Sequence, residues 1–321
     1  MKDRISVEDL LSADHFEREL RADVVKGFGS AQKSLPPKWF YDDEGSLLFE
    51  RITGLPEYYP SRAEREILGD RAARIAETGA RSLIELGSGS SEKTRILLDA
   101  LHPEVYVPVD VSRGALEAAA RGLSSAYPGL AVRAVVGDFQ HDLRLPRFQA
   151  PRLLAFLGGT IGNLLPEQRE RFLSDVRGLL EPGDALLVGA DLVKDVPTLV
   201  AAYDDAEGVT AAFNKNVLKV LNRRLRADFD PEDFEHVARW DEDGERIEMR
   251  LRAVREVTAE FAELGLAVRF EKGEELLTET SAKFRPDGLR GELVRAGFEP
   301  RHWWTDAGAR YGLCLAAVPP S

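Results

Sequence analysis

The feature that most constrains the fold is a regular alternation of apolar strands with helical segments, which begins near residue 81. Strands are predicted at 82–86, 105–109, 131–136, 152–157 and 184–190, and helices at 91–101, 113–125, 167–180 and 194–206. This alternation is typical of α/β proteins, in which a mainly parallel sheet carries helices on both faces. Ligands of such sheets bind beyond the carboxyl ends of the strands, so the residues after each strand are the first candidates for function.

The alternation is interrupted between about 208 and 284. A long helix is predicted at 209–226, and it is followed by period-2 segments at 236–240 and 246–252 that indicate a β-hairpin. Together with runs at 267–270 and 274–284, these segments predict a small mixed sheet. The alternation then resumes with a helix at 287–296 and strands at 300–304 and 311–318.

The first 60 residues contain predicted helices at 6–27 and 47–52, together with two aromatic, proline-containing loops. A capping box formed by Ser61 and Glu64 is expected to open another helix. We therefore expect two domains. One is an α/β domain of residues 61–195 and 285–321; the other is a discontinuous α+β domain of residues 1–60 and 196–284 that packs over the ligand edge of the sheet.

Composition narrows the classes of function. The net charge of −12 disfavours nucleic acid as the main partner, because phosphate binding needs a basic surface. No apolar run approaches the roughly 20 residues that span a bilayer, and the N-terminus lacks the apolar core of a signal peptide. One cysteine rules out an internal disulfide framework, and five histidines without ligand spacing predict no metal site. We expect a cytoplasmic, monomeric protein that acts on a small molecule.

The glycine turn after the first strand of the alternation, 85–94 (ELGSGSSEKT), predicts a nucleoside site. Gly87 and Gly89 let the backbone approach a ligand closely, because neither residue has a Cβ atom. Glu85 would repel the pyrophosphate of a dinucleotide, whereas it suits a ligand with an amine and a sulfonium. Ser91 replaces the third glycine of the dinucleotide fingerprint. Both departures favour S-adenosylmethionine over NAD and argue against a nicotinamide-dependent dehydrogenase.

Further polar residues follow the next strands. Asp110 can accept both ribose hydroxyls, or it can cap the following helix, a role that Ser112 could also fill. Asp138 can accept the adenine amino group while Phe139 packs on the base, or it can be an ordinary turn residue. Lys93 lies in a first helical turn, where the helix dipole disfavours a cation, so it could hold a ligand carboxylate or remain solvated.

The segment after the fourth strand, 157–166, contains three glycines and Asn163. Three glycines at a strand end indicate a backbone packed closely against a ligand, and a plain glycine turn is equally compatible with them. Asn163 offers both a donor and an acceptor but no acid–base function.

Seven segments occur in a characteristic order: 36–42 (PPKWFYD), 55–60 (LPEYYP), 85–94 (ELGSGSSEKT), 162–164 (GNL), 202–205 (AYDD), 210–216 (TAAFNKN) and 277–284 (LTETSAKF). In this set the chain resembles the L-histidine Nα-methyltransferases of ergothioneine biosynthesis, and the resemblance covers nearly the whole chain. It implies a class I methyltransferase domain with a Rossmann-like fold, plus a family-specific second domain. It also implies three methyl transfers from S-adenosylmethionine to the α-amino group of L-histidine, which give hercynine.

The resemblance further implies roles for individual residues. Around S-adenosylmethionine, in addition to Glu85, it places Gly87, Lys93, Asp110, Asp138 and Phe139. It places Asn163 and Tyr203 at the substrate carboxylate, and Glu279 and Ser281 at the imidazole. The remaining wall would be lined by Tyr41, Tyr58, Phe49 and Met249. Aromatic walls suit a centre that gains a permanent positive charge.

The hypothesis for the mechanism is direct displacement by a neutral α-amine, which requires the ammonium to lose a proton before each transfer. No strong base is obvious in the motifs, and Tyr41 is the leading candidate for that role. The nearest alternative is an N-methyltransferase for another amino acid, such as a tryptophan derivative. Glu279 argues against it, because an indole needs no buried carboxylate opposite a second ring nitrogen. A non-catalytic binding module is a third alternative. The match of Tyr203, Glu279 and Ser281 to the family's motifs argues against it, because a pocket that only packed would not need these residues.

Overall fold

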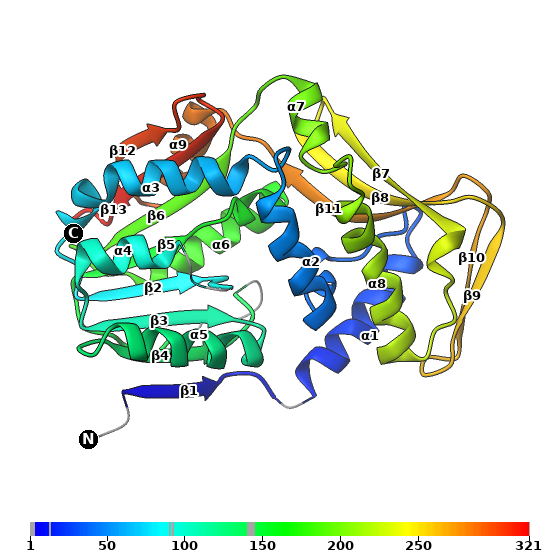
Figure 1. Cartoon of the computed structure of the whole chain (residues 1–321), viewed down its shortest axis with the longest axis horizontal. Coiled ribbons are helices and arrows are strands. Elements are labelled where there is room, and N and C mark those ends of the chain that lie inside the picture. The colour runs from blue at the N-terminus through cyan, green and yellow to red at the C-terminus, as the bar shows by residue number, and fades with distance from the viewer. Residues whose placement is uncertain (1–3, 13, 90, 92, 140–144, 321) are drawn as a thin grey trace. The chain divides into compact units, whose positions relative to one another are not determined.

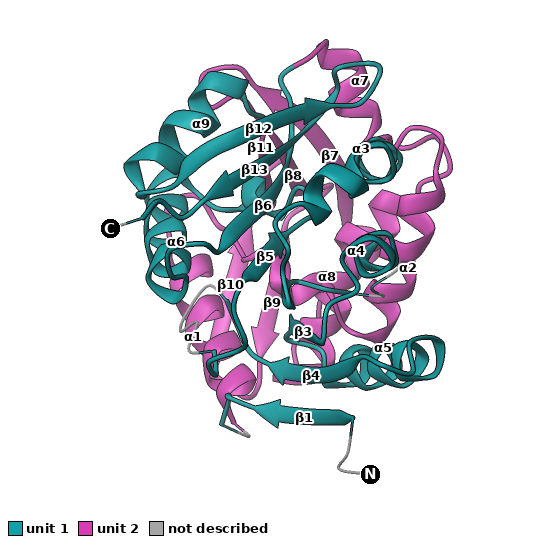
Figure 2. Ribbon diagram, turned by 90° about the vertical axis from the view of Figure 1, so that its left-hand side faces the viewer, with its two compact units in different colours: residues 1–12, 60–193, 283–321 teal, residues 13–59, 194–282 magenta. Residues whose placement is uncertain are grey.

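The computed structural model describes residues 4–12, 14–89, 91, 93–139 and 145–320. The chain divides into two compact units, shown in two colours in Figure 2. Unit 1 comprises residues 1–12, 60–193 and 283–321, and unit 2 comprises residues 13–59 and 194–282. The expected boundaries at 60, 195 and 285 lie close to these positions. The first 12 residues differ, because they belong to unit 1 rather than to the second domain.

Unit 1 is built on one eight-stranded sheet with the strand order β1-β4-β3-β2-β5-β6-β13-β12. The strands are β1 (Ile5–Asp9), β2 (Ser82–Leu86), β3 (Val105–Asp110), β4 (Ala131–Val136), β5 (Arg152–Phe156), β6 (Ala185–Asp191), β12 (Glu299–Thr305) and β13 (Tyr311–Ala317). Neighbours from β1 to β6 pair in parallel, whereas β13 runs antiparallel to both of its neighbours. The prediction of a mainly parallel sheet is therefore confirmed, and β2, β3 and β4 begin at the predicted residues.

The helices of unit 1 connect successive strands. They are α3 (Pro60–Ala76), α4 (Thr94–Leu101), α5 (Arg113–Ala126), α6 (Pro166–Leu179) and α9 (Pro286–Arg295). Figure 2 shows α4 and α5 on one side of the sheet and α6 and α9 on the other. Because β2, β3, β4 and β5 run in parallel (Figure 1), the segments that follow them meet at one edge of the sheet.

The N-terminal segment departs from the prediction of a helix at 6–27. Residues Ile5–Asp9 form β1, which pairs in parallel with β4, and the helix α1 begins only at His15 (His15–Phe28). Backbone bonds from Val132 N to Arg4 O and from Leu10 N to Val136 O attach both ends of the strand. The edge of β4 provides backbone hydrogen-bonding groups for this segment. Pairing with a strand that is distant in sequence can override a local helix propensity.

Unit 2 combines helices with two small sheets. Its helices are α1, α2 (Asp43–Gly54), α7 (Val196–Ala201) and α8 (Val209–Leu225). The first sheet has the order β11-β8-β7, with β7 (Phe234–Asp241), β8 (Arg246–Ala253) and β11 (Glu275–Ala282) all antiparallel. The predicted hairpin is thus present. The expectation of one mixed sheet is wrong, because β10 (Leu266–Phe270) pairs with β9 (Val257–Phe261), a strand that was not predicted.

The interior of unit 2 is rich in aromatic rings. Phe28, Phe229, Phe234, Phe261 and Phe270 contact one another at centroid distances between 5.2 and 6.3 Å, mostly edge to face. This cluster explains why β9 and β10 form a hairpin of their own. Val257, Ala259 and Phe261 alternate with exposed residues, so one face of β9 packs into the cluster.

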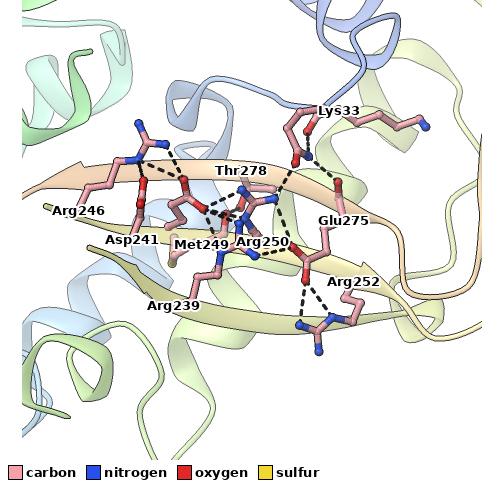
Figure 3. Close-up of polar contacts among 11 residues, drawn as sticks. Lys33, Arg239, Asp241, Arg246, Met249, Arg250, Arg252, Glu275 and Thr278 are labelled. Atoms are coloured by element: carbon pink, nitrogen blue, oxygen red, sulfur yellow. Dashed lines mark hydrogen bonds and ion pairs between the residues drawn. The ribbon is translucent and has the colours of Figure 1, made fainter. Parts of the chain in front are cut away.

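An ion-pair network crosses the three-stranded sheet of unit 2 (Figure 3). The Glu248 carboxylate, 2% exposed, accepts from Arg250 at 2.7 Å, Arg246 at 2.8 Å and Arg239 at 3.1 Å. Burial acts to raise the pKa of Glu248, but the guanidinium groups of Arg250 and Arg246 prevail and hold it below its ordinary value. Arg250 also reaches Glu275 on β11 at 3.3 Å, so the network joins all three strands.

The described parts of the chain contain no helix that is both long and apolar enough to cross a membrane.

Candidate functional site

The glycine turn after β2 is shaped by backbone conformation. Gly87 and Gly89 have φ angles of +69° and +49°, in the left-handed region that favours glycine. A Cβ atom at Gly89 would meet nothing within 4 Å, and one at Gly87 would meet only the Phe139 ring, at 3.7 Å. The backbone conformation, rather than a lack of space for a side chain, is therefore what requires glycine at these two positions.

Asp110 ties this turn to the end of β3. Its carboxylate accepts the N–H of Gly89 at 3.1 Å and the N–H of Ser112 at 2.9 Å. Burial raises the pKa of Asp110, and these backbone bonds oppose the rise. The N-cap of α5 is Ser112, whose Oγ accepts from Ala115, so the capping alternative for Asp110 does not hold.

Asp138 and Phe139 follow β4 as predicted. Asp138 is 4% exposed, although carboxylates usually lie at the surface. The Phe139 ring packs edge to face against Phe156 and Phe172, at 5.3 and 6.0 Å, and it lies beside Gly87. The structure thus brings the ends of β2, β3 and β4 together, with Gly87, Asp110 and Phe139 as neighbours at this edge.

Glu85 lies beneath the turn and is 3% exposed. Its Oε2 atom accepts from the Thr94 hydroxyl at 2.5 Å and from the Tyr106 hydroxyl at 2.6 Å. Burial raises the pKa of Glu85 to about 7, against the lowering effect of these two hydroxyls. The carboxylate therefore changes its charge near neutral pH, and it fixes the start of α4 to the neighbouring strand β3.

Ser88 is 7% exposed, and its Oγ has no hydrogen bond within the described part of the chain. A buried hydroxyl without a partner is costly, so its presence calls for an explanation such as a ligand. An open glycine turn, this hydroxyl and carboxylates after β3 and β4 fit a ligand with several hydroxyl and amino donors.

Lys93 forms an ion pair with Glu64 of α3. Glu64 is fully buried and also accepts from Gly158 N and the Tyr311 hydroxyl, each at 2.8 Å. The predicted capping role of Glu64 is wrong, because α3 begins at Pro60 and the carboxylate is occupied by partners from other elements. No local sequence signal distinguishes the two roles, and Glu64 was therefore missed as a site residue.

Asn163 ends the short helix η2 (Thr160–Asn163), which follows Gly158 and Gly159. Both glycines have positive φ angles, +80° and +70°. Asn163 is half-buried. Through Gly158, the Glu64 carboxylate links the loop that carries Asn163 to Lys93.

Several predicted substrate residues of unit 2 form one connected group. The Tyr203 hydroxyl donates to Ser281 Oγ at 2.8 Å, and both side chains are buried. The Tyr58 ring lies 6.3 Å from Tyr203 and 6.2 Å from Phe49, and Phe49 lies 5.5 Å from Tyr41. Tyr41, 39% exposed, is the member of this group that is open to solvent.

The turn that carries Tyr41 is held from α8. Asn216 Nδ2 donates to Phe40 O at 3.3 Å and to Asp42 Oδ1 at 2.8 Å, on either side of Tyr41. Phe213, which directly precedes a second buried asparagine of the same helix, Asn214, packs on the Tyr41 ring at 5.4 Å. Phe213 and Asn216 of the segment 210–216 thus hold Tyr41 and its turn in place.

Met249 and Glu279 stand opposite each other in β8 and β11. Directly opposed residues of an antiparallel pair point to the same face. The register shifts between Leu277 and Glu279, and such a bulge redirects the side chains that follow it. Met249 is 1% exposed and Glu279 is half-buried. The structure thus places Met249, Glu279 and Ser281 on one sheet.

Comparison with known proteins gives a consistent picture. Residues 20–318 match the family model of histidine-specific, SAM-dependent methyltransferases. The chain is 53% identical to histidine N-alpha-methyltransferase of Mycolicibacterium smegmatis, over 97% of this chain and 99% of that protein. It is 28% identical to 4-dimethylallyltryptophan N-methyltransferase of Claviceps purpurea, over 72% of this chain and 75% of that protein.

Two other similarities are more limited. Ergothioneine biosynthesis protein 1 of Neurospora crassa is 30% identical over 94% of this chain but only 35% of its own length. A solved S-adenosylmethionine-dependent methyltransferase of Clostridium acetobutylicum superposes with a TM-score of 0.50 at 12% identity, covering 84% of this chain and 98% of that one. This last similarity supports the class I methyltransferase fold alone.

The Glu85 environment predicts a pH-dependent stability. The folded pKa of about 7 lies above the ordinary value of 4.5, so the stabilising protonated form is complete below pH 4.5 and is lost as pH rises through 7. Relative to Glu85→Gln, the wild type should lose about 2 to 3 kcal/mol of unfolding free energy between about pH 5 and about pH 8. Urea unfolding of both proteins at the two pH values measures this difference. A difference that does not change with pH contradicts the assignment.

Proposed function

The chain belongs to the family of histidine-specific, S-adenosylmethionine-dependent methyltransferases, and from this membership we propose that it methylates the α-amino group of L-histidine three times. The product is the betaine hercynine, and the pathway is ergothioneine biosynthesis. The observation that carries the proposal is 53% identity to a histidine N-alpha-methyltransferase over almost the whole of both chains. The arrangement of Tyr203, Ser281 and Glu279 in unit 2 supports histidine as the substrate.

The residues at the carboxyl edge of the sheet in unit 1 are proposed to hold S-adenosylmethionine, which supplies an electrophilic methyl group when bound. Asp110 is suited to the ribose hydroxyls because its carboxylate is fixed by two backbone N–H groups. Asp138 would accept the adenine amino group, and Phe139, held by two other rings, would pack on the base. Gly87 and Glu85 complete the turn beneath the ligand.

Lys93 is proposed to bind the carboxylate of the methyl donor. In this structure its ammonium is paired with Glu64, so the lysine would serve two carboxylates at once. A three-donor ammonium group can do so. Glu64 is satisfied by Gly158 and Tyr311 as well, and it keeps these two bonds whichever partner Lys93 favours.

The substrate is proposed to bind through both of its ends. Asn163 and Tyr203 would hold the carboxylate, and Glu279 and Ser281 the imidazole, with Tyr58 and Met249 as apolar wall. The bond between the Tyr203 and Ser281 hydroxyls has a useful property, because either oxygen can donate. If Ser281 donates to Tyr203, the phenol can donate its hydrogen to a carboxylate. The direction of this hydrogen bond therefore couples Tyr203, at the substrate carboxylate, to Ser281, at the imidazole.

The chemical step requires a neutral amine, and the chain must accept the released proton. Tyr41 is proposed as the acceptor. Its phenol oxygen would accept the proton of the amine as its own hydrogen passes to solvent, which an exposure of 39% allows. The rings of Tyr41, Phe49 and Tyr58 present aromatic faces and edges in one cluster, which suits an amine that becomes permanently cationic.

A second candidate function is methylation of another amino acid, such as a tryptophan derivative, as the similarity to the Claviceps purpurea enzyme suggests. The half-buried Glu279 favours histidine, because the imidazole has a second ring nitrogen that can donate to a carboxylate and an indole does not. We also propose a cytoplasmic, monomeric enzyme. Light scattering that gave twice the mass of one chain would overturn the monomer.

Mass spectrometry of a reaction mixture tests the proposed function. Purified protein with S-adenosylmethionine and L-histidine should yield histidine with one, two and three added methyl groups, and the trimethylated form should accumulate. L-Tryptophan under the same conditions should remain unmodified. Unchanged histidine, or a preference for tryptophan, would overturn the proposal.

Replacement of Tyr41 by Phe tests the proton acceptor. The variant keeps the ring that packs on Phe49 and Phe213 but lacks the hydroxyl. We expect kcat to fall by about 10²-fold or more and the alkaline side of its pH profile to change. Tyr127→Phe is a matched control, because that hydroxyl lies in unit 1 and donates to Asp99 at 2.8 Å at an exposed position. An unchanged pH profile for Tyr41→Phe would exclude it as the base.

A further inference from the structure

Asn214 of α8 is a fully buried amide that the proposed roles leave unexplained. It lies in the segment 210–216, which the sequence pattern singled out. An asparagine side chain carries two N–H donors and an acceptor oxygen, and burying them costs free energy unless each finds a partner. In Asn214 all of these groups are used.

The Asn214 amide contacts all three strands of the sheet β11-β8-β7. Its Nδ2 donates to Arg250 O on β8 at 3.0 Å and lies 2.8 Å from His236 Nδ1 on β7. Its Oδ1 accepts from Thr278 Oγ1 on β11 at 2.6 Å. One helical side chain therefore fixes the positions of three strands relative to α8.

The contact with Thr278 is directed at the bulge that presents Glu279. Thr278 is 1% exposed, and its hydroxyl also lies 2.9 Å from the carbonyl oxygen of Met249 (Figure 3). The register shift between Leu277 and Glu279 surrounds this residue. Asn214 thus holds the backbone from which the candidate imidazole-binding carboxylate projects.

The contact with His236 is directed at Tyr203. His236 Nε2 lies 2.8 Å from Tyr203 O, and a carbonyl oxygen only accepts, so Nε2 carries the proton. Nδ1 must then accept from Asn214. Burial lowers the pKa of His236, against the raising effects of Tyr203 O and of Asp204 and Asp205, while Lys215 adds to the lowering. The neutral ring is therefore favoured.

We propose that Asn214 is a positioning residue for the amino-acid substrate, which acts through His236 on Tyr203 and through Thr278 on Glu279. This inference rests on the proposed function, because Tyr203 and Glu279 are the groups that would recognise the two ends of histidine. Asn214 itself touches no substrate. Its loss should therefore weaken histidine recognition and leave the methyl donor's site, which lies in unit 1, unaffected.

The test combines kinetics with binding. Asn214→Leu removes all three bonds at similar volume, and we expect the KM for histidine to rise about tenfold or more, with the Kd for S-adenosylhomocysteine within about twofold of wild type. His236→Leu should raise the same KM. His236→Gln should bring the KM for histidine back towards the wild-type value, because the glutamine amide N–H can replace Nε2–H as the donor to Tyr203 O. The double variant Asn214→Leu, His236→Leu should show less than the product of the single effects, since both act through Tyr203.

Asn222→Leu is the matched control. Asn222 lies on the same helix, and its amide makes two hydrogen bonds. Its Oδ1 accepts from Phe229 N at 3.0 Å, and its Nδ2 donates to Phe229 O at 2.7 Å. Its loss should lower the melting temperature without changing the KM for histidine. If it raises that KM as much as Asn214→Leu does, the effect of Asn214 is general destabilisation and the inference is overturned.

The remaining outcomes are also decisive. An Asn214→Leu protein that binds S-adenosylhomocysteine normally and has an unchanged histidine KM would overturn the positioning role. If that variant does not fold, the two His236 variants decide: equal KM values in His236→Leu and His236→Gln would overturn the inference. If the wild type itself does not methylate histidine, the proposed function is overturned together with this inference, whereas the other results affect the inference alone.

Discussion

The geometry of unit 1 depends on the buried carboxylate of Glu64. A carboxylate without exposed surface must be neutralised and fully hydrogen-bonded, because an unpaired buried charge is strongly unfavourable. Glu64 meets this requirement with Lys93, Gly158 N and the Tyr311 hydroxyl, which belong to three different parts of the chain. A Cβ atom at Gly189 would lie 2.2 Å from Glu64 Oε1, so β6 must carry glycine beside it. This one side chain holds the glycine turn and the loop of Asn163 in a fixed relation within the unit.

Unit 2 follows the same principle with an amide in place of a carboxylate. Its stability rests on the aromatic interior around Phe28, Phe229 and Phe270, but such rings alone do not specify the position of a polar side chain. Asn214 inside the sheet and the Glu248–Arg250 ion pair across it supply that specification. Buried polar groups are therefore where the fold determines the recognition chemistry, while apolar burial supplies most of the stability.

The sequence alone predicts the parallel core well, because β2, β3 and β4 are short apolar runs bounded by turn residues and their ends carry Gly87, Asp110 and Asp138. It predicts β1 poorly, because β1 depends on its pairing with β4, which is distant in sequence. It also predicts β9 poorly, because β9 depends on the packing of one face against the aromatic cluster of unit 2. The substrate residues are a different case. Tyr203 and Glu279 have no periodicity that marks them, and only the resemblance to a known family indicated them. Glu64 and Asn214 were missed because their roles arise entirely from tertiary contacts.

We propose that residues of unit 1 bind the nucleoside of the methyl donor and that Glu279 of unit 2 binds the imidazole of the amino acid. Calorimetric titration of S-adenosylhomocysteine, and then of L-histidine into the saturated protein, tests it directly in wild type, Asp110→Asn and Glu279→Ala. We expect Asp110→Asn to weaken S-adenosylhomocysteine binding. We expect Glu279→Ala to weaken histidine binding by about tenfold or more and to retain the affinity for S-adenosylhomocysteine. Loss of both affinities in Glu279→Ala, or histidine binding at wild-type strength, would contradict this proposal.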